Sequence, residues 1–357
     1  MTEKRAIVAI TKRGIEIAGM IRDKMPEIEA YAPVKFENPS YSRITCWFKE
    51  PTSQLVSSLF NKYDALIFIF SLGAVIRLIA PLVRDKKTDP AVVVIDDGAN
   101  FAISTLSGHL GGANSFARLI STFFDNCRPV ITTAADVNET IAVDLLGQEF
   151  SWMIENFDNV TKVSALMVNE ERIGVYQDTG EKNWWQKKPL PSNVEIVGSI
   201  EDLKTSRFKG AIVISDRLFQ DPLILDRSVI FRPKSLVVGL GVHSDTNVET
   251  IENGIRSALL KHGLSFGSVR NLASINRGAV VQGLKQFSEQ NKLPLEVFDR
   301  HILASIAVPN PSATVKKFEG TSSVSEASSI ISSKGKLVVP KQKYPPNLTV
   351  AISRVEF

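Results

Sequence analysis

The sequence predicts an α/β protein with an N-terminal open, mostly parallel α/β sheet domain, a small middle domain and a second α/β domain at the C-terminus. Short apolar runs alternate with helix-length amphipathic stretches through the first 150 residues, and the same alternation begins again at residue 236. The segment between them is richer in short polar and aromatic stretches. A chain of 357 residues is also too long for one ordinary hydrophobic core.

The N-terminal domain, residues 1–150, combines apolar runs that predict strands with amphipathic stretches that predict helices. The strands are expected at Ala6–Ile10, Ala65–Phe70, Ala91–Ile95 and Val130–Thr132. The helices are expected at Arg13–Lys24, Leu55–Lys62, Ala74–Ala80 and Ala113–Phe124. Such alternation predicts a mostly parallel sheet with helices on both faces.

The middle domain, residues 151–232, is expected to contain short strands, and residues 232–234 to form a linker, because Pro233 restricts its neighbour to extended conformations. The C-terminal domain, residues 234–357, is expected to begin with a strand at Leu236 that turns through Gly239 and Gly241. The strands expected in these two domains are Arg172–Tyr176, Ala211–Ser215, Val269–Ile275, Leu295–Phe298 and the pair Leu337–Val339 and Leu348–Ser353. The helices are expected at Asn247–His262, Arg277–Gln290 and Ser325–Ser333.

The composition, 44% hydrophobic and 22% charged, is typical of a soluble globular protein. No apolar run reaches the roughly 18 residues of a membrane-spanning helix, and the first ten residues read as a strand rather than a signal peptide. We therefore expect a cytoplasmic protein without a membrane partner. Two cysteines exclude a disulfide framework, and four histidines without ligand spacing predict no metal site.

The net charge of +4 is concentrated at the C-terminal end, where residues 233–357 carry 15 basic and nine acidic side chains. A basic domain suits an anionic ligand, and a solvated lysine-rich surface is the structural alternative. No basic helix, aromatic groove or known nucleic-acid motif accompanies this charge, so no nucleic-acid partner is expected.

The segment Ser107–Asn114 is the strongest candidate site in the sequence. Its glycines precede a predicted helix, where backbone N–H groups can reach an anion near the positive helix N-terminus. His109 within this segment can exchange protons near neutral pH. The structural alternative is that Ser107 or Asn114 caps the helix and His109 is an ordinary surface residue.

Two acidic segments follow predicted strands. Thr132–Asn138, with Asp144 beyond it, places hydroxyls and carboxylates where they could bind a ligand or activate water, and an N-cap followed by a polar loop is the alternative. Asp96 and Asp97 follow the strand at 91–95, and a turn explains them more simply than a general base does.

Basic and glycine-rich segments suggest two further ligand contacts. Arg77 lies in a basic cluster around Pro81 that suits a polycarboxylated ligand. For any other ligand, these side chains would be solvent-exposed charges at the edge of the site. Gly239–Ser244 begins like a dinucleotide fingerprint, but Ser244 replaces the third glycine. A tight turn or a carboxylate site that includes His243 is favoured there.

The segments described above occur in order with Lys86–Ala91 and Pro129–Asn138, and together they resemble the cobalt-precorrin-5A hydrolases of anaerobic cobalamin biosynthesis. Further segments extend the resemblance over nearly the full chain: Tyr176–Trp184, Leu272–Ile275, Gly320–Ala327, Lys336–Lys341 and Thr349–Ala351.

The resemblance implies hydrolytic opening of a δ-lactone on a ring-contracted cobalt corrinoid, with loss of a two-carbon fragment as acetaldehyde. It implies His109 as an acid–base group, with Thr133 and Asp136 as further catalytic residues and backbone amides of the glycine pair as oxyanion donors. The residues it implies for substrate binding are Gly73, Arg77, Ser107, Gly111, Gly112, Asn114, Asn138, Gly241 and His243. Cobalt arrives with the substrate, so no cofactor of the protein's own is expected.

Two other functions remain open at this point. One is a non-catalytic protein that binds or hands on a corrinoid intermediate of the same pathway, and the other is a nucleotide-binding enzyme, which Ser244 disfavours. The expected partner is a cobalt-corrinoid small molecule, placed between the first and third domains. A homodimer, or contact with neighbouring enzymes of the pathway, is compatible with the sequence.

Overall fold

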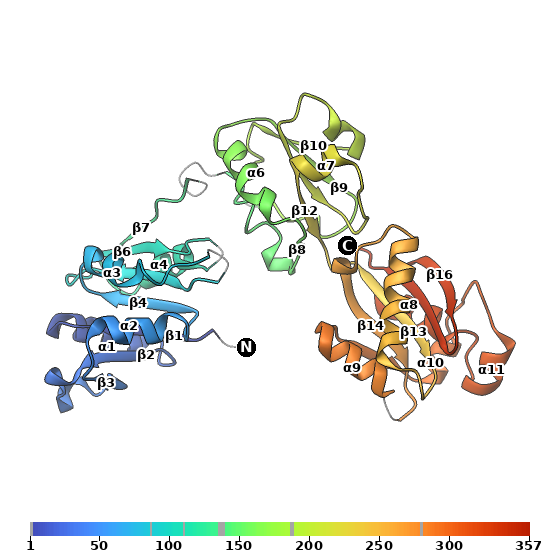
Figure 1. Ribbon diagram of the computed structural model, residues 1–357, viewed down its shortest axis with the longest axis horizontal. Coiled ribbons are helices and arrows are strands. Elements are labelled where there is room, and N and C mark those ends of the chain that lie inside the picture. Colours follow the sequence, from blue (N-terminus) through green and yellow to red (C-terminus); the bar gives the residue numbers. More distant parts are fainter. Residues whose placement is uncertain (1–2, 86–87, 110, 135–139, 186–188, 279–280) are drawn as a thin grey trace. The chain divides into compact units, whose positions relative to one another are not determined.

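The computed structural model describes residues 3–85, 88–109, 111–134, 140–185, 189–278 and 281–357 (Figure 1). The chain divides into two compact units, Met1–Leu145 and Leu146–Phe357. Within the described residues the strands form three sheets, one in the first unit and two in the second. The protein therefore has the predicted fold class, an α/β architecture in three parts.

The first unit is a sheet with helices packed on both faces, in the strand order β3-β2-β1-β4-β5-β6-β7. Its strands are β1 (Arg5–Ala9), β2 (Glu29–Pro33), β3 (Cys46–Phe48), β4 (Ala65–Ile69), β5 (Ala91–Ile95), β6 (Phe101–Leu106) and β7 (Arg128–Val130). Its helices are α1 (Lys12–Lys24), α2 (Thr52–Phe60), α3 (Leu72–Ile79) and α4 (Ala113–Ser121), with short 3-10 turns at Val34–Phe36 and Pro39–Tyr41.

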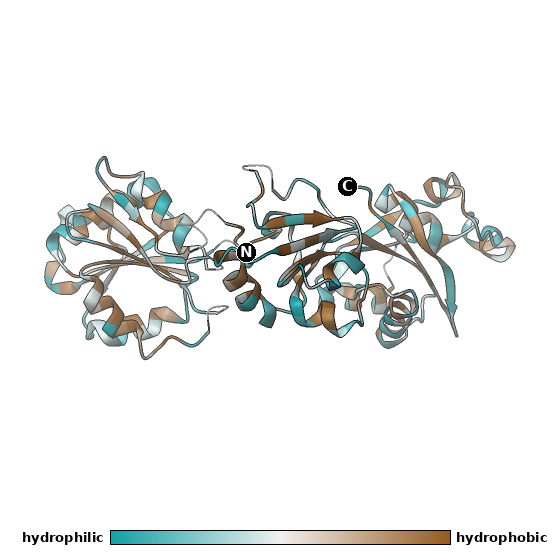
Figure 2. Ribbon diagram, turned by 90° about the horizontal axis from the view of Figure 1, so that it is seen from above, coloured by the Kyte–Doolittle hydropathy of each residue, from teal (hydrophilic) through white to brown (hydrophobic). Residues whose placement is uncertain are grey.

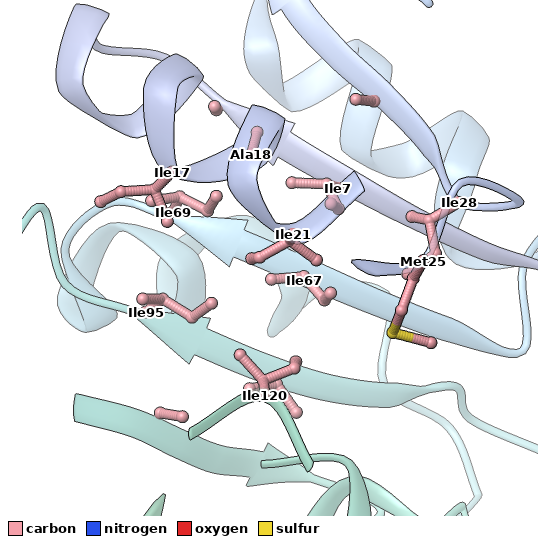
Figure 3. Close-up of a cluster of buried hydrophobic side chains, with 14 of the residues drawn as sticks. Ile7, Ile17, Ala18, Ile21, Met25, Ile28, Ile67, Ile69, Ile95 and Ile120 are labelled. Atoms are coloured by element: carbon pink, nitrogen blue, oxygen red, sulfur yellow. The ribbon is translucent and has the colours of Figure 1, made fainter. Parts of the chain in front are cut away.

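Alternating side chains of the central strands supply two hydrophobic cores, because successive residues of a strand point to opposite faces of the sheet. Ile7, Ile67 and Ile95 face α1 and α4, where they meet Ile21 and Ile120 (Figure 3). The opposite face carries the neighbouring residues of the same strands and packs against α2 and α3. β4 and β5 are accordingly hydrophobic along their whole length, and the strands of the sheets are coloured largely brown (Figure 2). This pattern is typical of a sheet covered on both sides.

Strand direction reverses between β5 and β6, and this reversal determines where the candidate site lies. β1 to β5 are mutually parallel, β6 runs antiparallel to β5, and β7 runs parallel to β6. Leu106, at the end of β6, therefore lies beside Val92, at the start of β5. Loops that follow β6 and β7 emerge at the edge where β4 and β5 begin, opposite to the loops that follow β4 and β5.

The second unit contains two sheets. The middle sheet has the order β10-β9-β11-β12-β8 and the C-terminal sheet the order β15-β14-β13-β17-β16. The elements around the middle sheet are a 3-10 turn at Gln148–Phe150, β8 (Met153–Ile154), α6 (Asp158–Val168), β9 (Ile173–Gln177), β10 (Val194–Val197), a 3-10 turn at Ile200–Lys204, β11 (Gly210–Ile214), α7 (Pro222–Arg227) and β12 (Ser228–Arg232).

The C-terminal sheet is covered by α8 and α9 on one face and by α12 on the other. Its elements are β13 (Leu236–Val242), α8 (Val248–Lys261), a 3-10 turn at Phe266–Ser268, β14 (Val269–Ile275), α9 (Gln282–Asn291), β15 (Leu295–Phe298), α10 (Arg300–Ala304), α11 (Ala313–Glu319), α12 (Val324–Ser333), β16 (Lys336–Tyr344) and β17 (Leu348–Arg354). The predicted strands at 269–275 and 295–298 and the predicted pairing of the last two strands are confirmed.

Helix α12 approaches the sheet unusually closely because small residues face each other. Ser325, Ser328 and Ser329 are fully buried, and the Ser329 hydroxyl lies 2.8 Å from that of Ser353 in β17. A Cβ atom on Gly239 would lie 1.9 Å from the Ser325 carbonyl oxygen. The predicted turn through Gly239 and Gly241 is wrong, because both residues lie within β13. Gly239 is required by helix packing.

Replacing Gly239 with alanine is expected to lower the free energy of unfolding by about 1–3 kcal/mol, because α12 must move away from β13 to admit the methyl group. Chemical denaturation monitored by circular dichroism measures this loss. Gly198→Ala is the matched control, since a Cβ atom there meets no atom within 4 Å. Equal stability of both variants would contradict the close packing.

An ion pair with a fully buried carboxylate joins the two sheets of the second unit. Asp216 follows β11 and is fully buried; it accepts two 2.7 Å hydrogen bonds from the Arg354 guanidinium of β17 and one from the Ser235 hydroxyl. Arg232, also fully buried, pairs with Glu155. The prediction that Arg232 belongs to a linker is therefore wrong, because it is the last residue of β12 and its side chain is an internal partner.

Candidate active site

The loop from Ser107 to Gly112 leads from β6 into α4 at the edge where β4 and β5 begin. The Ser107 hydroxyl donates to the Asp89 carbonyl just before β5, and the Ser107 carbonyl accepts from the Ala113 N–H. Ser107 has φ +53°, a left-handed conformation that non-glycine residues rarely adopt. The surrounding hydrogen bonds hold this strained backbone in place, and such strain is concentrated at functional sites.

His109 projects from this loop toward Asp144. Its Nδ1 atom lies 3.1 Å from Asp144 Oδ1 and 3.3 Å from Oδ2, and the two side chains are only 12% and 16% exposed. A carboxylate at this distance favours the tautomer with the proton on Nδ1, which makes Nε2 the basic nitrogen. The pair therefore has the arrangement of an oriented acid–base histidine.

Asn114, in the first turn of α4, links the histidine loop to the segment after β7. It is 5% exposed; its Oδ1 accepts from the Ser104 hydroxyl at 2.6 Å, and its Nδ2 donates to Thr133 Oγ1 at 3.0 Å. Gly112 caps α4 without a side-chain cap. The alternative that Ser107 or Asn114 caps this helix is therefore wrong, because both side chains bond elsewhere.

The two glycines before α4 have different constraints. Gly112 has φ +82°, and its N–H donates to the His109 carbonyl at 2.9 Å, so this amide supports the loop. A Cβ atom on Gly111 would lie 2.4 Å from Ser107 Cβ. Glycine is therefore required at position 111, because the backbone there passes too close to Ser107 to admit a side chain.

Gly73 and Arg77 lie at the opposite edge of the same sheet. Both belong to α3, which follows the end of β4, and Arg77 Nη1 donates back to the Gly73 carbonyl at 3.1 Å. Strand β4 has five residues and separates the two edges by roughly 15 Å at about 3.3 Å per residue. The structure brings Ser107, His109 and Asn114 together, but it does not bring Gly73 and Arg77 to them.

Asp96 forms a turn, as the simpler interpretation predicts. Its carboxylate accepts from the backbone N–H groups of Gly98, Asn100 and Phe101. Burial raises the pKa of Asp96, but a hydrogen bond from the Asn100 side chain and these backbone hydrogen bonds outweigh it and leave the pKa below its ordinary value. A carboxylate held ionised by its own turn is a weak general base.

A cavity of about 670 Å³ lies in the C-terminal part of the second unit. Gly241, near the end of β13, and His243, just after it, line the cavity together with Arg277 and residues of α11 and β16. Gly241 and His243, which the resemblance implies for substrate binding, thus lie in a cavity wall. Most of the exposed surface of the cavity is apolar, and Phe318 and Tyr344 are among the lining residues.

Asp136 and Asn138, two of the expected site residues, lie outside the described residues, as does the basic pair at 86–87. Asp144, which the sequence offers as a carboxylate beyond Thr132–Asn138, is the partner of His109, and this pairing is what the sequence analysis did not predict. Where the chain is described, no group of three His, Cys, Asp or Glu side chains is arranged to hold a metal ion. The described helices also lack the length and apolar character needed to cross a membrane.

Family models define the class of protein. Residues 54–136 match the model of the cobalamin synthesis G N-terminal region, residues 141–233 that of the cobalamin biosynthesis central region, and residues 236–353 that of the cobalamin synthesis G C-terminus. The three matches follow one another along the chain, as do the three sheets. They define a three-part protein of cobalamin biosynthesis.

Curated relatives specify the family. The chain is 38% identical over 356 residues to cobalt-precorrin-5A hydrolase of Priestia megaterium, across 99% of this chain and 95% of the relative. It is 28% identical to the enzyme of the same name from Salmonella typhimurium, across 94% and 93%. A crystal structure of a cobalamin biosynthesis protein G homolog from Sulfolobus solfataricus aligns over 99% of this chain and 97% of that one, at 21% identity and a TM-score of 0.38. The chain belongs to the cobalt-precorrin-5A hydrolase family and is a hydrolase.

Proposed function

We propose that this protein hydrolyses cobalt-precorrin-5A, opening the δ-lactone of this ring-contracted cobalt corrinoid and releasing acetaldehyde. The observation that carries the proposal is the 38% identity to a relative of that name over almost the whole chain. The cobalt belongs to the substrate, and the protein uses no cofactor of its own. The substrate is its small-molecule partner.

Within this proposal, His109 is the acid–base group. Nε2 takes a proton from the attacking water as it adds to the lactone carbonyl, and the resulting imidazolium is stabilised by Asp144. The same nitrogen can return the proton in the carbon–carbon cleavage that follows. Asp144 acts through His109 and is a positioning residue.

The proposal also gives roles to the segment that begins at Thr133 and to the glycine pair before α4. Thr133 is anchored by the buried Asn114 amide, which fixes its hydroxyl near the histidine loop. Asp136 would follow Thr133 along the same segment, and Asn138 would contact substrate there. The oxyanion donor is assigned to Gly111, since the Gly112 amide is engaged with His109.

Basic side chains bind the carboxylates of the substrate in this proposal, and Arg77 of the first unit is one of them. Arg77→Ala is expected to raise the apparent KM several-fold with little change in kcat, and capture should weaken as salt rises, because exposed charges are screened over about 10 Å at 0.1 M ionic strength. Steady-state kinetics at two salt concentrations measures both effects. Arg13→Ala, a substitution on the exposed side of α1, is the control. A KM indifferent to both changes would remove Arg77 from the binding site.

The deciding experiment incubates the purified full chain with cobalt-precorrin-5A and measures acetaldehyde together with the mass of the corrinoid product. Stoichiometric acetaldehyde and a product lacking the two-carbon fragment support the proposal. Tight corrinoid binding without acetaldehyde would contradict it and would identify a carrier of the same pathway.

A further inference from the structure

The cavity in the C-terminal part of the second unit contains an ion pair that spans its wall. Arg277, after β14, and Glu319, the last residue of α11, meet with Arg277 Nη2 2.5 Å from Glu319 Oε1 and Nε 3.4 Å from Oε2. Arg277 Nη1 donates to the Val242 carbonyl at 2.6 Å, which orients the guanidinium from the sheet side. The sheet thus orients the Arg277 guanidinium, and the Glu319 carboxylate is its ion-pair partner.

The carboxylate that pairs with Arg277 comes from α11, a helix that is capped by Ser312 and packs against the domain through the partly buried Val315. Helix α11 contains no buried residue in its seven-residue length. Its apolar side chain Phe318 is 72% exposed and yet lines the cavity. The Arg277–Glu319 pair, with the two side chains 27% and 22% exposed, therefore connects a helix without a buried residue to the segment that follows β14.

The charges around the cavity are unequal. Among the described residues that line it, Glu319 is the sole carboxylate, whereas Arg277, Lys341 and Lys343 are cationic. Lys341 Nζ donates to the Asn310 carbonyl, and Lys343 is exposed. Apolar walls with a cationic rim suit a ligand that has an apolar body and peripheral carboxylates.

We propose that Glu319 occupies the position of a ligand carboxylate beside the Arg277 guanidinium. An acidic ligand with an apolar ring body enters this cavity, replaces Glu319 as the partner of Arg277 and is covered by Phe318. The exchange substitutes one carboxylate–guanidinium pair for another, so ligand affinity is reduced by the competing Glu319. The choice of a polycarboxylated corrinoid as this ligand rests on the proposed function.

The test is equilibrium binding of cobyrinic acid, a polycarboxylated cobalt corrinoid, to the full chain by titration calorimetry. Glu319→Gln removes the competitor and is expected to tighten Kd roughly 3- to 10-fold, whereas Arg277→Gln is expected to weaken it about 10-fold or more. The double variant should bind like Arg277→Gln, because the competitor matters only when Arg277 is present. The fully esterified corrinoid should not distinguish Glu319→Gln from the unaltered protein.

Controls separate this competition from a structural role of the ion pair. Glu252→Gln, in the exposed Arg256–Glu252 pair of α8, should leave binding unchanged. Circular dichroism verifies that each variant is folded. Weaker or unchanged binding by folded Glu319→Gln, or no binding of cobyrinic acid to the unaltered chain, would overturn the inference. These outcomes are independent of acetaldehyde release, so either proposal can fail while the other stands.

Discussion

Replacing His109 with alanine is expected to lower turnover of cobalt-precorrin-5A by roughly 10²-fold or more, because the chain loses the group proposed to move protons at the lactone. Binding of the corrinoid should be preserved. Asp144→Asn should lower kcat as well, since an amide oxygen is a poorer partner for the imidazolium that forms. Acetaldehyde release under saturating substrate measures both effects.

His262→Ala is the matched control for the histidine substitution. His262 caps α8, where its Nδ1 lies 2.9 Å from the Ala258 carbonyl, in the second unit rather than the first. Its replacement should leave turnover unchanged. If His109→Ala turns over substrate like the His262 variant, His109 has a structural role and the acid–base assignment is wrong.

Replacing Arg354 with methionine is expected to lower the free energy of unfolding by about 3–5 kcal/mol, because the fully buried Asp216 carboxylate then keeps only the Ser235 hydroxyl among the partners described above. Methionine retains the apolar stem of the arginine, so the loss reports on charge. Chemical denaturation of the full chain measures it.

A double substitution tests the origin of this loss. Adding Asp216→Ala to Arg354→Met should recover part of the stability, since no buried charge then remains unpaired. Lys285→Met, which breaks an exposed pair with Glu289, should change stability by less than about 0.5 kcal/mol. Strictly additive losses from the two single substitutions would show that the pair contributes no coupling.

Long apolar runs made much of the fold predictable. The run at 91–95 is a buried strand with the predicted bounds, because a continuous β-branched run between turn residues has few other solutions. The strand at 269–275 also has the predicted bounds, although Arg270, Asn271 and Ser274 interrupt its apolar residues. β6 was missed, since its residues 103–106 are only partly buried and include hydroxyls. The direction of β6 could not be inferred either, because alternation of elements does not specify the direction of a strand.

This missing direction also limited prediction of the site. The glycine-rich segment was recognisable from its own residues, and the start of α4 after Gly112 confirms the local part of that interpretation. The reversal at β6 decides that Arg77 lies at the other edge. The pairing of His109 with Asp144 joins residues 35 positions apart, and such contacts depend on the tertiary fold.

The buried hydroxyls of α12 have a thermodynamic consequence. Exposure of apolar surface raises the heat capacity of an unfolding protein, whereas exposure of polar surface lowers it. The first unit buries isoleucine, valine and phenylalanine on both faces of its sheet, while one face of the C-terminal sheet buries serines. Burial of these serines therefore lowers the heat-capacity increment of the C-terminal sheet, and the free energy of unfolding curves less strongly with temperature there.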